Sequence, residues 1–258
     1  MCLNPKERFS SRVADYVRYR PSYPKDVIHL LQNECGLTAN WRVADVGAGP
    51  GNLTRLFLDN GNIVYAIEPN REMREAGEGL MRQYPKYDSV AGSAEETGLA
   101  DHCVELITAG QAFHWFDHAA TRTEFERILK PHGWVALVWN MRQTAETSFA
   151  RRYEAILRML PEYERVKADG APIEELRAFF SPGAMKQATF YYEQRLGFEA
   201  FLGRVLSSSY VPLPGTPGHE EIVAALTGLF AEEAVDAKIC FAYDTQVYYG
   251  RLTAEIRA

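Results

Sequence analysis

The sequence lacks the features that mark several large classes of protein. Its four cysteines, at positions 2, 35, 103 and 240, form no C-x-x-C pair, so their spacing indicates neither a disulfide framework nor a zinc knuckle. No apolar run approaches about 18 residues, and no apolar leader stands at the N-terminus. We therefore expect a soluble, cytoplasmic protein without a membrane partner.

An excess of positive charge is also missing. The chain has 28 basic against 34 acidic residues, which gives a net charge of −6. This balance argues against a nucleic-acid partner, because binding phosphates needs a basic surface. What the chain does have is 258 residues of which 47% are hydrophobic, enough to bury a substantial core.

Strand and helix patterns alternate from about residue 41 to residue 141, which predicts an α/β fold with a doubly wound, mostly parallel sheet. Strands are expected near 42–47, 62–68, 89–91, 104–110 and 134–139. Helices are expected at 70–82 and 118–130, with Asn70 and Asp117 as N-caps and a turn at 131–133. Beyond residue 142 we expect helices at 147–160, 173–180, 198–207 and 219–233, and strands at 187–196 and 238–252.

The most informative segment runs from Arg42 to Gly51. Val43 to Val46 read as a short buried strand, and Gly47, Gly49 and Gly51 follow it directly. A strand that ends in alternating glycines has no side chains where the backbone turns, so a ligand can lie against main-chain N–H groups at a helix N-terminus. The pattern predicts a nucleotide-like ligand.

A carboxylate at the end of the next strand narrows this interpretation. Glu68 stands 21 residues after Gly47, where an acidic side chain can accept hydrogen bonds from a ribose diol. Dinucleotide folds space their glycines as G-x-G-x-x-G, whereas this chain has G-x-G-x-G with Asn52 at the place of the third small residue. A dinucleotide oxidoreductase is therefore disfavoured, although it shares Gly47 and Glu68.

These residues carry a family resemblance. The glycine pattern, with Asp45 two residues before it, resembles motif I of class I S-adenosylmethionine (SAM)-dependent methyltransferases. Two further segments, Phe9 with 16–24 and Gln111–Asp117, resemble the small-molecule group that includes trans-aconitate methyltransferases. The resemblance implies a seven-stranded sheet with a helical cap in a single domain. We expect an N-terminal arm and helix at 1–40, the SAM-binding core at 41–141, the cap at 142–184, and two last strands with helices at 185–258.

The resemblance implies a set of cofactor contacts. The backbone around Gly47, Ala48 and Gly49 should hold the methionine and ribose portions of SAM, Glu68 the ribose hydroxyls, and Pro69 the adenine. Ser93 stands where the family has an acidic residue, so Ala94 N–H and Glu95 are the alternatives for the adenine edge. Gln111 should lie beside the methionine end. Arg20 is expected to bind the methionine carboxylate, with Tyr16 and Tyr19 closing over the ligand, or else these aromatic residues simply cover the edge of the sheet.

The segment after the fourth strand should border the methyl acceptor, through His114, Trp115 and Phe116. His114 is a candidate catalytic base, since its ordinary pKa of about 6.5 suits proton removal near neutrality. Alternatively, it orients the loop by hydrogen bonding. His114 and His118 have neither an intervening carboxylate nor an evident third ligand, so no metal site is expected.

Together these features predict an enzyme that transfers a methyl group from SAM to a small-molecule metabolite, most readily to an oxygen. Transfer to nitrogen or carbon stays open, as does a SAM-binding regulatory or partner protein without catalysis. The sequence indicates neither the identity of the acceptor nor the oligomeric state.

Overall fold

The structure is a computed structural model that describes residues 17–166 and 170–253. The chain divides into two compact units, which are described separately here. We call one the glycine-loop unit and the other the aromatic unit. The glycine-loop unit consists of Ser22–Asn140, Gly170–Phe190 and Thr245–Ala258, and the aromatic unit of Met1–Pro21, Met141–Asp169 and Tyr191–Asp244.

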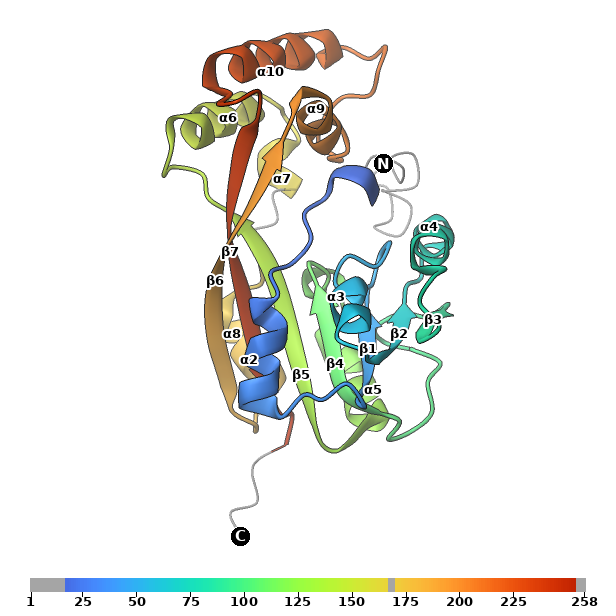
Figure 1. The fold of residues 1–258 in the computed structure, drawn as a ribbon. Helices are drawn as coiled ribbons and strands as arrows, with labels where there is room; N and C mark the ends of the chain where they lie inside the picture. Colours follow the sequence, from blue (N-terminus) through green and yellow to red (C-terminus); the bar gives the residue numbers. More distant parts are fainter. Residues whose placement is uncertain (1–16, 167–169, 254–258) are drawn as a thin grey trace. The chain divides into compact units, whose positions relative to one another are not determined.

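Seven strands form one sheet in the order β3-β2-β1-β4-β5-β7-β6 (Figure 1). They are β1 (Arg42–Val46), β2 (Ile63–Ile67), β3 (Tyr87–Val90), β4 (Val104–Gly110), β5 (Leu129–Arg142), β6 (Met185–Leu196) and β7 (Ile239–Gly250). The β1–β2, β1–β4, β2–β3 and β4–β5 pairs are parallel. The predicted fold class, with a mostly parallel seven-stranded sheet, is confirmed.

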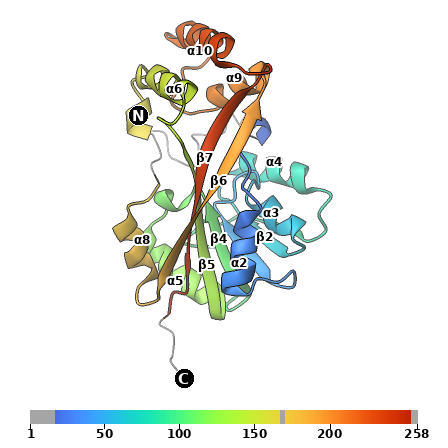
Figure 2. The ribbon, with the colours of Figure 1, turned by 60° about the vertical axis from the view of Figure 1, so that its left-hand side comes forward.

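Helices cover both faces of the sheet in the glycine-loop unit. Figure 2 shows α2 (Asp26–Cys35) and α3 (Thr54–Asp59) on one face, and α5 (His118–Ile128) and α8 (Ile173–Phe180) on the other. The first face buries an apolar core that includes Leu31, Phe57 and Val43. On the second face, the rings of Phe125 and Phe179 meet edge to face at 5.9 Å. The expected cap segment 142–184 is thus shared between the units, because α8 lies in this one.

Two predicted helix starts are confirmed. The Asn70 side chain accepts a hydrogen bond of 2.9 Å from the backbone N–H of Met73 at the start of α4 (Arg71–Met81). The Asp117 carboxylate accepts hydrogen bonds from the N–H groups of Ala119 and Ala120 at the start of α5. Each cap satisfies backbone donors that have no partner within the helix.

The predicted boundary after α5 is wrong. We expected the helix to continue to residue 130 and a strand to begin at 134, but the helix ends at Ile128 and β5 begins at Leu129. Val104 pairs with Leu129 and Leu106 with Trp134, so residues 130–133 bulge opposite Glu105. The Glu105 carboxylate accepts hydrogen bonds from Lys130 and from Arg42 N–H, and these contacts hold the bulge against the sheet.

The aromatic unit contains α6 (Ser148–Arg158), α7 (Tyr163–Val166), α9 (Phe198–Leu206) and α10 (His219–Glu233). The helix predicted at 147–160 is confirmed as α6, and its residues Phe149, Tyr153 and Leu157 are buried. Phe149 and Phe201 pack with Phe241 of β7, at ring distances of 5.1 and 6.0 Å from it. Across the described residues, no helix is both long enough and apolar enough to span a bilayer.

Candidate functional site

The strand order reverses at β1 in the glycine-loop unit. The chain runs outward from β1 through β2 to β3, and then returns to the other side of β1 as β4. In open α/β sheets, ligands bind beyond the carboxyl ends of the strands at such a reversal. Three predicted groups follow these carboxyl ends: the loop 47–51 after β1, Glu68 after β2, and Gln111 after β4.

The glycine loop is shaped by positive φ angles and by close packing. Gly47 has φ +67°, and a Cβ built there would lie 2.6 Å from Ala112 Cβ and 3.4 Å from the Phe116 ring. Gly49 has φ +57°, but a Cβ there would meet nothing within 4 Å. Gly47 is therefore required by its neighbours, whereas Gly49 presents open backbone on which a ligand can lie.

Glu68 organises the loop from its own side chain. Its Oε2 accepts a 2.9 Å hydrogen bond from Gly49 N–H, and its Oε1 accepts one of 2.9 Å from Asn70 N–H. Arg74 fixes the next turn by donating to the carbonyl oxygens of Glu68 and Pro69 at 2.8 and 3.0 Å. A carboxylate has about four lone-pair sites, so two remain available for a diol. Burial raises the pKa of Glu68, while the Asn70 and Gly49 bonds oppose that rise.

Asp45 lies beneath the loop and is fully buried. Its Oδ2 accepts a hydrogen bond of 2.5 Å from the Thr54 hydroxyl, across the turn from β1 to α3. Burial raises the pKa of Asp45 to about 7, although the Thr54 hydrogen bonds act in the opposite direction. The motif predicts Asp45 as a cofactor residue. In this structure its Oδ2 is bonded to Thr54, and its assignment to the cofactor stays a prediction.

Gln111 adopts a backbone conformation that residues other than glycine rarely take. Its φ is +56°, directly after β4, and its N–H donates to Val138 O at 2.9 Å. Its side-chain amide donates to Asn140 O at 3.1 Å. The buried Asn140 side chain in turn donates to Ser22 O and accepts from the Thr245 hydroxyl. The strained conformation is thus held by a satisfied polar network at the predicted methionine end.

The residues that follow Gln111 differ in their surroundings. Phe113 is buried and stacks on His118 at 4.2 Å, whereas Trp115 is 45% exposed. His114 lies 4.9 Å from the Trp115 ring, and its Nδ1 is buried without a hydrogen-bond partner in the described part of the chain. Burial lowers the pKa of His114 to about 4, so the ring is neutral at physiological pH.

The segment predicted to meet adenine is anchored to the start of α5. The N–H of Ser93 donates to Glu96 O at 2.9 Å, and Ala94 is buried. The Glu95 carboxylate accepts a 3.0 Å hydrogen bond from Asp117 N–H. These contacts hold the segment beside the residues after β4.

Two of the predicted cofactor residues belong to the aromatic unit. Tyr19 is buried there, with its ring against Gly203 of α9, and its hydroxyl donates to Glu199 at 3.2 Å. Arg20 lies in the same unit, and the assignment of both residues to SAM stays a prediction. Phe9 and Tyr16 lie outside the described residues.

Sequence reasoning missed several supporting groups in the glycine-loop unit. Thr54 and Arg74 act on Asp45 and on the Glu68–Pro69 turn, and Asn140 supports Gln111. One signal was available for Asn140, because it is a polar residue that follows the apolar run 134–139 of a central strand. Thr54 and Arg74 carry no such signal, since each reads as an ordinary helix residue.

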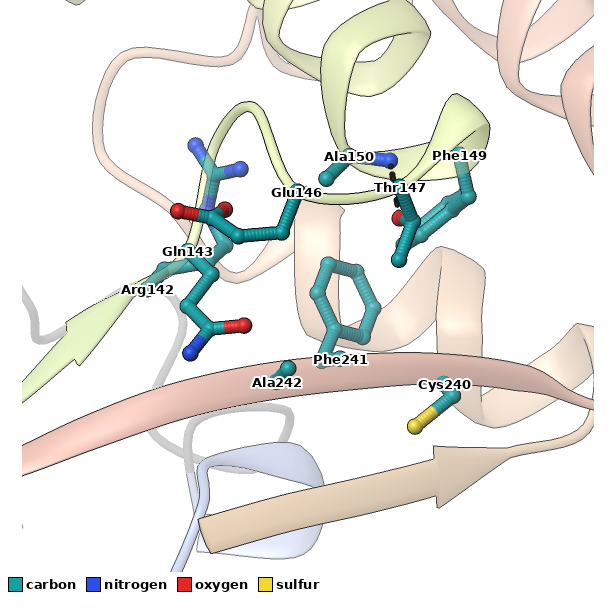
Figure 3. A pocket seen from close by; sticks show the side chains of 9 residues that line it. All are labelled: Arg142, Gln143, Glu146, Thr147, Phe149, Ala150, Cys240, Phe241 and Ala242. Atoms are coloured by element: carbon teal, nitrogen blue, oxygen red, sulfur yellow. Dashed lines mark hydrogen bonds between the residues drawn. The ribbon is translucent and has the colours of Figure 1, made fainter. Parts of the chain in front are cut away.

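A separate pocket lies in the aromatic unit (Figure 3). Its walls come from the end of β5, the first turn of α6 and the part of β7 around Phe241. The lining residues are Arg142, Gln143, Glu146, Thr147, Phe149, Ala150, Cys240, Phe241 and Ala242. Thr147 caps α6 by accepting a hydrogen bond from Ala150 N–H, which Figure 3 marks with a dashed line. Among residues 17–166 and 170–253, no group of three or more His, Cys, Asp or Glu side chains could hold a metal ion.

Comparison with known proteins finds a family model that matches part of the glycine-loop unit. Residues 44–137, which contain the loop, Glu68 and Gln111, match the family model of a methyltransferase domain. This stretch of the chain is therefore similar to a methyltransferase domain. Domains of this class use SAM as the methyl donor, and the open backbone at Gly49 with the available lone pairs of Glu68 fits that cofactor.

Named relatives match the methyltransferase domain over part of their length. An uncharacterised methyltransferase of Schizosaccharomyces pombe is 34% identical over 138 residues, which cover 53% of this chain and 54% of the relative. An uncharacterised methyltransferase of Mycobacterium tuberculosis is 40% identical over 134 residues, 52% of each chain. The chain thus spans about half the length of the curated relatives it matches.

Among solved structures, a protein from Anaeromyxobacter dehalogenans described as a candidate type II methyltransferase has the same fold. Its TM-score is 0.64 at 22% identity, and the match covers 92% of this chain and 100% of that one. At this identity the likeness supports the fold alone.

Proposed function

We propose that this protein transfers a methyl group from SAM to a small-molecule metabolite. The observation that carries the proposal is the joint arrangement of the glycine loop and Glu68 within a matched methyltransferase domain. Gly49 N–H and the Glu68 carboxylate are already hydrogen-bonded to each other, so the ribose-binding group is oriented before the ligand arrives. Preorganisation of this kind lowers the entropy cost of binding.

The residues assigned to SAM follow the order of the strands. Gly47, Ala48 and Gly49 would hold the methionine and ribose portions along the backbone, and Glu68 the ribose hydroxyls. Pro69 would pack against the adenine, and the segment 93–95 would border its edge. SAM supplies an electrophilic methyl group on a sulfonium centre. Gln111, fixed by Asn140, would position the methionine end of the cofactor.

The protein contributes to the reaction mainly by alignment and by exclusion of water. His114, Trp115 and Phe116 would border the acceptor. With a pKa near 4, His114 is a weak base at neutral pH, since a catalytic base works best when its pKa lies near the operating pH. We therefore assign His114 to positioning the acceptor. An acceptor that is already ionised, such as a carboxylate oxygen, needs no base at all.

Two measurements test this function. SAM and S-adenosylhomocysteine should raise the melting temperature of the protein, and NAD and NADP should not. A ligand that binds the folded state stabilises it by an amount set by the ligand concentration relative to Kd. Equal stabilisation by NAD would contradict the proposal and favour a dinucleotide oxidoreductase. Incubation with SAM and a metabolite extract should then yield S-adenosylhomocysteine together with a product heavier by one methyl group. Binding of SAM without turnover on any extract would favour a SAM-binding regulator instead.

The finer points of the proposal are the methylated atom and the subgroup. A carboxylate oxygen is preferred because it is already ionised and needs no base, which agrees with the low pKa of His114. Mass spectrometry of the product, with hydrolysis to separate esters from ethers and amines, tests this preference. It also tests the resemblance to trans-aconitate methyltransferases, which predicts a base-labile ester.

A further inference from the structure

Two arginines and several tyrosines of the aromatic unit form a cluster that the proposed cofactor site does not use. We call it the arginine–tyrosine cluster and define it by Arg142, Arg204, Glu154, Tyr153, Tyr163 and Tyr243. Its members come from the end of β5, from α6, α7 and α9, and from β7. All six lie in the aromatic unit, so the cluster is complete within that unit.

Arg142 is the better satisfied of the two cations. Its side chain is 16% exposed, and its Nη2 donates to Glu154 at 2.6 Å and to the Tyr163 hydroxyl at 3.0 Å. Its guanidinium carbon lies 4.7 Å from the centre of the Tyr153 ring. Its Nη1, however, is buried without a hydrogen-bond partner in the described residues. The Nη2 side of the guanidinium group is therefore hydrogen-bonded, whereas the Nη1 side has no partner among the described residues.

Arg204, on α9, has still fewer partners. Within the described residues, its Nη2 donates one hydrogen bond, to the Tyr243 hydroxyl, at a long 3.5 Å. Its Nε is buried and has no partner, and it forms no ion pair with any carboxylate in the described part of the chain. Both guanidinium groups act on the pKa of the buried Tyr153 phenol, against the upward effect of burial, which places both cations near that ring.

The charges of the cluster do not balance. Glu154 is its one carboxylate, and it is shared between Arg142 and the exposed Arg158. Hydrogen bonds from Tyr163 and Arg142 hold the pKa of Glu154 below its ordinary value although burial acts to raise it, so Glu154 is ionised and fully used. Buried polar atoms in native proteins are almost always hydrogen-bonded, and an exception calls for a missing partner. For unpaired guanidinium donors that partner is an anion.

We propose that the arginine–tyrosine cluster binds an oxyanion group, a carboxylate or a phosphate, of a small molecule. The planar forks of Arg142 and Arg204 suit two-oxygen groups, because two parallel N–H donors match their geometry. Tyr153, Tyr163 and Tyr243 supply hydroxyl groups beside the forks. This binding site is complete within the aromatic unit and does not rest on the proposed function.

The test is anion binding to the full chain without SAM, followed by thermal melting. Inorganic phosphate and succinate are titrated separately, against sodium chloride at matched ionic strength. We expect saturable stabilisation by at least one of the two oxyanions and none by chloride, and the stronger ligand distinguishes phosphoryl from carboxylate recognition. Equal shifts with all three salts would overturn the proposal.

Variants then locate the site. Arg204→Gln should weaken oxyanion binding by at least about tenfold, because the variant loses a charged hydrogen-bonding partner. Arg195→Gln is the matched control, since Arg195 is a 66% exposed arginine of the same unit that pairs with Glu193. Glu154→Gln should tighten binding severalfold because it removes the competing carboxylate, a gain that a purely structural role would not produce. If Arg204→Gln does not fold, the wild-type titration and Glu154→Gln still decide the matter.

Affinity for S-adenosylhomocysteine, measured on the same proteins, separates this inference from the proposed function. It should be unchanged in Arg204→Gln. A loss there would mean that Arg204 serves cofactor binding rather than a separate anion site, and it would overturn the inference. If the protein binds S-adenosylhomocysteine normally but binds no oxyanion, the proposed anion site is overturned and the methyltransferase proposal still stands.

Discussion

The two units handle charge in opposite ways. In the glycine-loop unit, the candidate site is made of backbone N–H groups and two carboxylates, Asp45 and Glu68, which are hydrogen-bonded within a few residues of the same turn. In the aromatic unit, the prominent polar groups are the guanidinium groups of Arg142 and Arg204, and each has a donor without a partner among the described residues. The first arrangement suits a ligand that carries hydroxyl groups and a sulfonium cation, and the second suits an anion.

This difference bears on the two ligands that we propose for the chain. The proposed cofactor loop offers the Glu68 carboxylate to hydroxyl groups, whereas the proposed anion site offers guanidinium donors to an oxyanion.

The largest effect should come from the buried Asp45. Its pKa in the folded protein is about 7, against an ordinary value of 3.8, so the folded state keeps a proton that the unfolded state releases. The free energy of unfolding should therefore fall as the pH rises from about 4 to about 7, by roughly 4 kcal/mol in total. Asp45→Asn, which stays neutral, should flatten this dependence in urea denaturation across that range.

Asp88→Asn is the control for the charge change alone, because Asp88 is exposed on β3. It should leave the pH profile as it is in the wild type. A profile that Asp45→Asn does not flatten would mean that this carboxylate is ionised in the folded protein, and the glycine-loop unit would then hold two buried anions rather than one.

Gly47→Ala should follow, because it combines two costs. The φ of +67° strains any side chain, and the new Cβ would lie 2.6 Å from Ala112 Cβ. Together they should lower the free energy of unfolding by roughly 3 kcal/mol and disturb the loop that we propose as the SAM site. Gly36→Ala isolates the first cost, since Gly36 has φ +79° with nothing within 4 Å, and about 1 kcal/mol is expected there. Equal losses of unfolding free energy in the two variants would show that Ala112 moves away from the new Cβ at little cost.

A change at Glu68 should affect the ligand more than the fold. Glu68→Gln keeps the shape but removes the charge that strengthens the bonds to Gly49 N–H and to the ribose. Calorimetric titration should show S-adenosylhomocysteine binding weaker by roughly 1.5–3 kcal/mol. Glu75→Gln, on the exposed face of α4 where Glu75 pairs with Arg71, should bind normally. Unaltered affinity in Glu68→Gln would place the ribose elsewhere.

The smallest effect is expected at His114. Because burial lowers its pKa to about 4, the ring is already neutral across the working range, and its protonation contributes no limb near pH 6.5 to the rate profile. His114→Gln should lower kcat by less than about tenfold, while His29→Gln, an exposed change on α2, should leave it unaltered. A loss of about 10²–10⁴-fold would instead identify a catalytic base.

The part of the site that could be predicted from sequence consists of residues that lie close together in the chain. The glycine loop, Glu68 and the caps Asn70 and Asp117 each depend on neighbours within a few positions, so spacing alone locates them. The bulge at 130–133 could not be predicted, because it depends on Glu105 in another strand. A Pro-His-Gly run reads as a turn until its partner strand is known.

The arginine–tyrosine cluster shows the opposite limit. Its members are spread from residue 142 to residue 243, on helices and strands whose patterns indicate only an amphipathic core. An arginine on α9 with no nearby carboxylate in the sequence reads as a solvated side chain, and only the tertiary structure shows its Nε to be buried. Scattered cationic sites of this kind have no spacing to detect.

Gln111 carries a consequence for the history and engineering of this protein. A glutamine at φ +56° is less stable there than asparagine or glycine, which tolerate that conformation. Selection for thermal tolerance alone would therefore replace it, and would shorten or remove the amide that reaches Asn140. If the glutamine persists under such selection, the placement of its amide at Asn140 matters more to the protein than the stability lost at position 111.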